Sequence, residues 1–115
     1  MQPTTARGCV LIVEDPRVRR LIAGILKRER YAVVEAELEE ALRILREAPD
    51  GVALLITNVP AHFCEFAETL PLVYVAAFPD PALADRFRRC RTLCKPFRPC
   101  ELNQCAAELV APADV

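Results

Sequence analysis

The chain lacks the features that mark membrane, secreted or nucleic-acid-binding proteins. Its 115 residues contain no tryptophan, one histidine and only three glycines, and no apolar run approaches the roughly 18 residues of a spanning helix. Residues 1–8 are polar and lack the apolar core of a signal peptide. A net charge of −1 gives no general attraction to nucleic acid phosphates. We therefore expect a cytoplasmic protein that binds neither membranes nor nucleic acid.

The composition that is present is that of one globular domain. Hydrophobic residues make up 53% of the chain and charged residues 27%, and a chain of this length buries a single core. We expect one domain over residues 1–115, with its core at about 9–110. The ends at 1–7 and 111–115 are expected to be loose.

The six cysteines would suggest disulfides in a secreted chain, but nothing else here looks secreted. Several lie in apolar periodic segments, which favours free thiols that pack as small hydrophobes. A metal site or a redox role remains as an alternative. The spacing Cys90-x3-Cys94 and the pair His62-x-Cys64 are weak metal signals, because neither belongs to a repeated Cys-x2-Cys pattern. The cysteines are Cys9, Cys64, Cys90, Cys94, Cys100 and Cys105.

Apolar runs alternate with helical patterns along the chain, which predicts an α/β fold with a parallel sheet. We expect strands near 9–14, 31–35, 52–57, 71–77 and 92–95. Helices are expected after Asp15, along 38–45, after Asp80 and from Pro99. The first should bury a stripe of Val18, Leu21, Ile22 and Ile25, and the helix after Asp80 should bury Leu83, Ala84 and Phe87.

Several residues at the ends of the expected strands lie where a ligand site would be expected. Ligands of open parallel sheets bind beyond the carboxyl ends of the strands. Glu14 and Asp15, Asn58, Ala76 and Lys95 all fall at such ends. Lysine is scarce, since only Lys27 and Lys95 of the 15 basic residues are lysines. A lysine at position 95 is therefore a weak sign that this residue has a specific role.

Three segments in order carry a family resemblance: Val-Glu-Asp-Pro (13–16), Leu-Leu-Ile-Thr-Asn-Val-Pro (54–60) and Cys-Lys-Pro-Phe (94–97). With them, the chain resembles a receiver domain of bacterial two-component response regulators. The resemblance implies a doubly wound, five-stranded parallel sheet of the flavodoxin-like or CheY-like type, in the order 2-1-3-4-5. It also implies a cis peptide bond between Lys95 and Pro96.

The same resemblance implies that the phosphorelay chemistry is degenerate. Asn58 stands where the family has its phosphoacceptor aspartate, and a neutral amide is a poor nucleophile. Ala76 replaces a hydroxyl that binds the phosphoryl group, and Thr92 replaces the switch aromatic. Glu14 and Asp15 match the acidic pair that holds Mg²⁺. We therefore expect no firm cofactor, with weak Mg²⁺ binding at the two acids left open.

The connection between Asn58 and Ala76 is too short for a full helix and its strand. A crossover with its helix needs at least about 10–12 residues. We expect the third helix to be shortened to a stub around 63–69.

Two groups of charges each allow two interpretations. Glu14 can serve a residual cation or polar cluster, or it can form a structural ion pair with Lys95. The arginines near the fourth helix and fifth strand can be an ordinary solvated face or a partner-binding surface. They are Arg86, Arg88, Arg89, Arg91 and Arg98. Glu35, Glu37, Glu39 and Glu40 form an acidic counterpart that would allow weak self-association.

Three functions follow from these observations. We favour a non-enzymatic, phosphorylation-independent interaction module of a two-component system, with a histidine kinase or effector domain as partner. A homodimer could form through the fourth helix, fifth strand and fifth helix. The alternative is a cysteine-based metal or redox sensor on the same fold. An enzyme with Asp15 as nucleophile ranks last, because no acid-base partner is recognisable.

Overall fold

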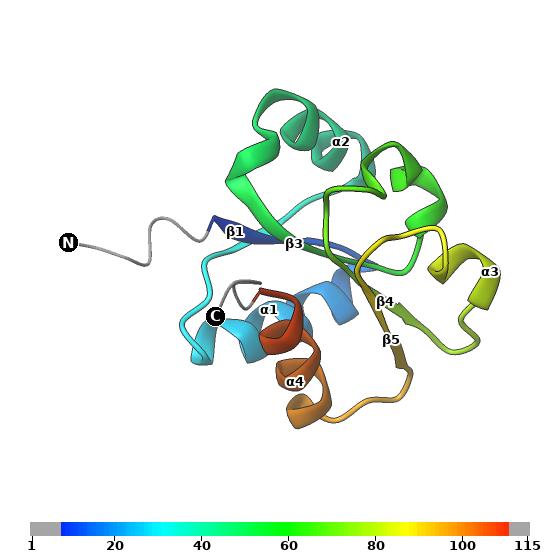
Figure 1. Cartoon of the computed structure of the whole chain (residues 1–115). Helices are drawn as coiled ribbons and strands as arrows, with labels where there is room; N and C mark the ends of the chain where they lie inside the picture. Colours follow the sequence, from blue (N-terminus) through cyan, green and yellow to red (C-terminus); the bar gives the residue numbers. More distant parts are fainter. Residues whose placement is uncertain (1–7, 111–115) are drawn as a thin grey trace.

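Strands and helices alternate along residues 8–110, the part of the chain that the computed structural model describes (Figure 1). The strands are β1 (Cys9–Val13), β2 (Val33–Glu35), β3 (Val52–Thr57), β4 (Leu72–Ala76) and β5 (Cys90–Cys94). The α-helices are α1 (Pro16–Arg28), α2 (Leu38–Glu47), α3 (Pro81–Ala84) and α4 (Pro99–Val110). Two 3-10 helices, η2 (Pro49–Gly51) and η3 (Pro60–Phe66), complete the chain. The ends expected to be loose lie outside the described residues.

The five strands form one parallel sheet in the order β2-β1-β3-β4-β5, which confirms the predicted topology. Val13 of β1 pairs with Thr57 of β3, and Ala76 of β4 pairs with Cys94 of β5. The carboxyl ends of the strands are thereby level along one edge of the sheet. β5 begins two residues earlier than expected and ends before Lys95.

The helices cover both faces of the sheet, as the predicted doubly wound architecture requires (Figure 1). On one face, Ile22 and Leu26 of α1 and Leu102 of α4 pack with the strands in one buried cluster. On the other face, a second cluster joins residues from α2 and η3, including Leu45 and Phe63. Each strand therefore contributes to two cores.

Helix α1 follows the predicted start but not the whole predicted stripe. The Asp15 carboxylate caps the helix by accepting from the backbone N–H groups of Arg17 at 3.1 Å and Val18 at 3.4 Å. Ile22 and Ile25 are buried, whereas Leu21 is 57% exposed, so its predicted burial is wrong. Each residue turns a helix by about 100°, and the face centred on Ile22 leaves Leu21 on the flank.

The crossover between β3 and β4 contains the expected short helix, but it is the 3-10 helix η3 at Pro60–Phe66, three residues earlier than the predicted 63–69, and it is kinked at Phe63. Ala67 donates its N–H to the carbonyl of Cys64 at 3.1 Å, three residues back, and Phe63 is fully buried. A 3-10 helix rises about 2.0 Å per residue, against about 1.5 Å for an α-helix. Few residues can therefore cross the sheet and still place an aromatic ring in the core.

Helix α3 is a single turn, which corrects the expected placement of the arginines. Asp80 caps it by accepting from the N–H of Ala82 at 3.0 Å, and the helix ends at Ala84. Phe87 is buried as predicted, but it lies beyond the helix. Arg86, Arg88 and Arg89 lie in the turn before β5 rather than on a helix face.

Candidate functional site

The predicted site residues gather at the carboxyl edge of the sheet. Glu14 and Asp15 follow β1, Asn58 follows β3 and Lys95 follows β5. Because Val13 and Thr57 are paired in register, Glu14 and Asn58 leave neighbouring strands side by side. Asn58 is half-buried there. The topology therefore brings the acids, the amide and the lysine to one edge.

A buried ion pair joins the two ends of this group. The Lys95 ammonium lies 3.0 Å from Oε2 of Glu14, whose side chain is fully buried. Oε1 of Glu14 accepts from the N–H of Asp15 at 2.9 Å. Since β3 and β4 lie between β1 and β5, the Lys95 side chain must extend across the ends of both strands. Glu14 was expected either to serve a residual cation site or to form an ion pair with Lys95, and the structure contains the ion pair.

These contacts leave a poor ligand set for a tightly bound Mg²⁺. Both oxygens of Glu14 are engaged, and Oδ1 of Asp15 caps α1. Mg²⁺ demands near-octahedral oxygen ligation and favours carboxylates, whereas Asn58 offers only a neutral oxygen. Among residues 8–110, no group of three His, Cys, Asp or Glu side chains could hold a metal ion.

The backbone around Lys95 fixes its direction. The N–H of Lys95 donates to the carbonyl of Ala76 at 2.9 Å, and the peptide bond to Pro96 is cis, as expected. Cys94 is exposed, while Lys95 turns inward to Glu14. Successive side chains of a strand face opposite ways, so Cys94 cannot share the acidic pocket.

Ala76 and Thr92, the residues predicted to stand at the family's switch positions, lie near a tyrosine that was not singled out from the sequence. Ala76 is half-buried, and Thr92 is exposed on β5 directly opposite Tyr74 of β4. The Tyr74 hydroxyl accepts from the N–H of Asp80 at 3.2 Å. The only sequence signal is a tyrosine in a buried strand, whose hydroxyl needs a partner. Tyr74 therefore anchors the loop that leads into α3.

A second missed residue shapes the turn that carries Asn58. Thr57 is fully buried, and its hydroxyl accepts from the N–H of Val59 at 3.1 Å. Threonine hydroxyls often bond the backbone two residues on in this way. The bond holds the start of the β3–η3 loop.

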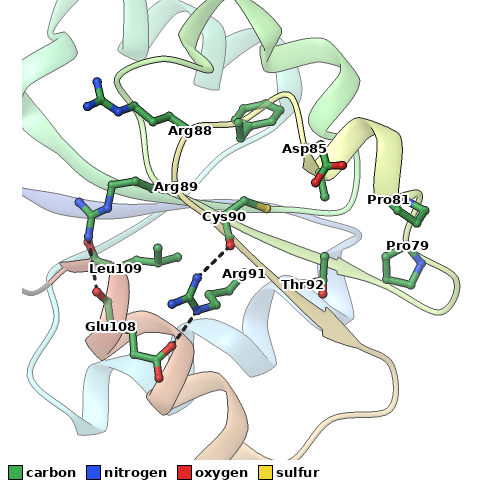
Figure 2. Close-up of a pocket in the computed structure, with 12 residues that line it drawn as sticks. Pro79, Pro81, Asp85, Arg88, Arg89, Cys90, Arg91, Thr92, Glu108 and Leu109 are labelled. Atoms are coloured by element: carbon green, nitrogen blue, oxygen red, sulfur yellow. Dashed lines mark hydrogen bonds and ion pairs between the residues drawn. The ribbon is translucent and has the colours of Figure 1, made fainter.

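The predicted arginine surface is only partly free. Arg91 pairs with Glu108 of α4 at 2.8 Å and lowers the pKa of that carboxyl. Arg89 donates to the carbonyl of Leu109 at 2.9 Å, as Figure 2 shows. Arg86, Arg88 and Arg98 form no ion pair with residues 8–110.

The acidic counterpart is also partly neutralised within the chain. Glu35 and Glu37 both pair with Arg19, at 3.5 Å and 3.3 Å. Glu40 pairs with Arg43 at 3.6 Å. Self-association through this acidic face therefore has fewer free carboxylates than the sequence suggests.

A cavity of about 730 Å³ lies beside β5, between the α3 segment and α4. Arg88, Arg89 and Arg91 line it together with Asp85 and Glu108 (Figure 2). It adjoins the predicted interaction surface and not the carboxyl edge of the sheet.

All six cysteines are free, but the expectation that they are buried holds only in part. Cys94 and Cys100 are exposed, and the other four are half-buried. Burial raises the pKa of Cys90 to about 11 and also raises the pKa values of Cys9 and Cys105. The structure brings no metal-binding cluster together among these thiols within residues 8–110.

These environments predict an order of thiol reactivity. A short iodoacetamide pulse at pH 7 should label Cys94 and Cys100 first and Cys90 last, because the thiolate is the nucleophile. Cys90 labelling should rise with pH, since its thiolate fraction grows up to its pKa of about 11. Peptide mass spectrometry at pH 7 and pH 9 measures this order. Fast labelling of Cys90 at pH 7 would contradict the described packing.

Several proteins of known structure have a fold similar to that of this chain. The chain is similar to a signal receiver domain of a two-component histidine kinase from Clostridium thermocellum, with 15% identity and a TM-score of 0.74 over 91% of this chain and 98% of that one. It is also similar to the receiver domain of NtrX from Brucella abortus, with 21% identity and a TM-score of 0.69 over 88% and 97%. Vibrio cholerae chemotaxis protein CheY4 gives 17% identity and a TM-score of 0.69 over 89% and 98%.

These likenesses establish a receiver-type, CheY-like fold for the chain. No protein-family profile matches the sequence, and no curated protein is detectably similar to it. Within residues 8–110, none of the helices has the length and apolar character needed to span a bilayer.

Proposed function

We propose that the chain is a receiver-like module of a two-component phosphorelay that binds protein partners without being phosphorylated. It would work as a single domain over residues 1–115, with its core at about 9–110. The observation that carries the proposal is Asn58 at the carboxyl end of β3, in a receiver-type fold whose lysine is already paired with Glu14. The fold supports a receiver-like module, and the neutral amide of Asn58 supports the loss of phosphotransfer.

Each step of a phosphorylation switch lacks a group here. The Asn58 amide offers no carboxylate to attack phosphorus. Ala76 has no hydroxyl for the phosphoryl oxygens, and Thr92 has no ring to move. The ring of Tyr74, which pairs with Thr92 across β4 and β5, is held by a hydrogen bond from the N–H of Asp80 to its hydroxyl. These losses together favour a constitutive shape over a switched one.

Mg²⁺ binding is proposed to be weak at most. A cation at Glu14 must displace the Lys95 ammonium, and one at Asp15 must compete with the cap of α1. We propose that the module functions without a cofactor and is not an enzyme.

The partner surface is proposed to comprise the α3 segment (α3 and the turn at 85–89), β5 and α4. α3 and α4 correspond to the fourth and fifth helices expected from the sequence. Arg86, Arg88 and Arg98 have exposed side chains that can pair with carboxylates of a histidine kinase or effector domain. Neither nucleic acid nor membrane is a proposed partner. Six free cysteines fit a reducing compartment, and we propose the cytoplasm.

The test is the response of the folded protein to a phosphodonor. In ¹H–¹⁵N NMR spectra, amide signals of β4, the α3 segment and β5 should be unchanged by acetyl phosphate with Mg²⁺. A coordinated shift of these signals that decays as the donor is consumed would show a working switch. That result would refute the proposal.

A further inference from the structure

β5 is an edge strand, and one side of it is unpaired within residues 8–110. Toward β4, Leu72 donates to the carbonyl of Arg89 at 3.0 Å, and Lys95 donates to the carbonyl of Ala76 at 2.9 Å. Backbone groups alternate in direction along a strand. The N–H and C=O groups of Cys90, Thr92 and Cys94 therefore point away from the sheet.

This edge is open along its whole length. The cavity of about 730 Å³ reaches Cys90, Arg91 and Thr92, and a second cavity of about 360 Å³ continues past Leu93 and Cys94. Thr92 and Glu108 line both cavities, so the two form one trough along the strand. Because α3 is a single turn, its residues Pro81 and Ala84 line only the first cavity and none of them reaches the second.

The trough carries opposite charges at its two ends. Arg88, Arg89 and Asp85 line it at the Cys90 end, so their formal charges leave that end net positive, and Glu101 lines it at the Cys94 end. Glu108 lies between the two cavities. A two-fold axis that pairs two antiparallel β5 edges would place the basic end of each copy beside the acidic end of the other. The surface is thus complementary to itself, as an isologous interface requires.

An arginine on an edge strand usually discourages pairing, but Arg91 is neutralised here. Its guanidinium pairs with Glu108 at 2.8 Å and donates to the carbonyl of Cys90 at 3.3 Å. A carbonyl oxygen has a second lone pair, so Cys90 can still accept from another strand. The edge therefore presents backbone groups with little net charge over them.

We propose that two copies of this chain associate by antiparallel pairing of their β5 edges, centred on Thr92. In this register Cys90 of one copy lies opposite Cys94 of the other, and the two sheets become continuous. The inference deepens the proposed function, on which it rests for the choice of surface. It names one partner as a second copy and gives the strand register.

The first test removes the edge donor without touching the β4 ladder. Thr92→Pro deletes an N–H that faces away from β4, and proline is tolerated on edge strands. Thr92→Val, the matched control, keeps the N–H and the branched side chain. By sedimentation velocity up to about 100 µM, a range that populates weak complexes, wild type and Thr92→Val should dimerise and Thr92→Pro should stay monomeric. A monomeric wild type, or a dimer of folded Thr92→Pro equal to wild type, overturns the proposal.

The second test reads the register with native thiols and does not depend on folding of a proline variant. Within one strand the Cα atoms of Cys90 and Cys94 are about 13 Å apart, at about 3.3 Å per residue, beyond the roughly 7 Å limit of a disulfide. A Cys90–Cys94 disulfide must therefore join two chains, where opposed Cα atoms lie about 5.5 Å apart. Diamide supplies the oxidant and takes up two electrons and two protons for each bond.

We expect the Cys90–Cys94 product in wild type and in Cys100→Ser, and its loss in Cys90→Ser and in Cys94→Ser. Cys94–Cys94 or Cys100–Cys100 products in its place would refute the register. The phosphodonor test above is independent of both experiments. Failure of pairing with unchanged NMR spectra would sink this inference alone, whereas pairing with a phosphodonor response would sink only the proposed loss of switching.

Discussion

Replacing Lys95 with methionine is expected to lower the free energy of unfolding by about 2–3 kcal/mol. The change keeps most of the side-chain volume but leaves the Glu14 carboxylate, which is fully buried, without its ammonium partner. Breaking a buried pair from one side typically costs about 3–5 kcal/mol, and we expect less here because Lys95 is 28% exposed. Urea unfolding followed by circular dichroism at pH 7 measures the loss.

The matched variant is Glu14→Gln, which removes the other charge and keeps the shape. It should cost about 1 kcal/mol, because the remaining ammonium can reach water and the amide can still accept from Asp15. The double variant should recover much of the stability that Lys95→Met loses. Equal or additive losses for the two single variants would show that the pair is not coupled as the structure has it.

Treating the wild-type protein with acetyl phosphate and Mg²⁺ is expected to give no acyl phosphate, whereas Asn58→Asp should give a small, base-labile adduct. The substitution restores a carboxylate nucleophile at the end of β3 and adds one negative charge beside Glu14. Intact mass spectrometry before and after brief alkaline treatment measures both forms. We expect no adduct on the wild-type protein and partial modification of Asn58→Asp.

The restored nucleophile should not restore a switch. Ala76 still offers no hydroxyl and Thr92 no ring, so the NMR signals of β5 should stay in place even in the modified fraction. Asn58→Ala is the matched control, because it also removes the amide but supplies no carboxylate. A stable acyl phosphate on wild type, or full conformational activation of Asn58→Asp, would show that the relay has been misread.

The sequence predicted the sheet because its signals are local. Asp15 followed by Pro16 marks the start of α1, and buried apolar runs mark β1, β3 and β4. The order of the strands followed from the family resemblance rather than from periodicity. The gathering of Glu14, Asn58 and Lys95 then follows from parallel topology, since carboxyl ends of parallel strands share an edge.

The length of α3 could not be predicted, because tertiary contacts end it. Residues 85–95 contain neither glycine nor proline, and local propensity alone would allow the helix to continue past Ala84. The chain instead turns to bury Phe87, and Arg88 donates its N–H to the carbonyl of Ala67 at 3.0 Å. The partners of Arg89 and Arg91 escaped prediction for a similar reason, since they lie on α4, which the sequence places far away.

Tyr74, whose hydroxyl accepts a hydrogen bond from the N–H of Asp80, can serve as an intrinsic spectroscopic probe. The chain has no tryptophan and only two tyrosines, so near-ultraviolet absorption and fluorescence come from very few rings. One of them, Tyr74, lies opposite Thr92 on β5 and holds the loop before α3. Events at the β5 edge should therefore change an intrinsic tyrosine signal, and binding there can be titrated on unlabelled protein.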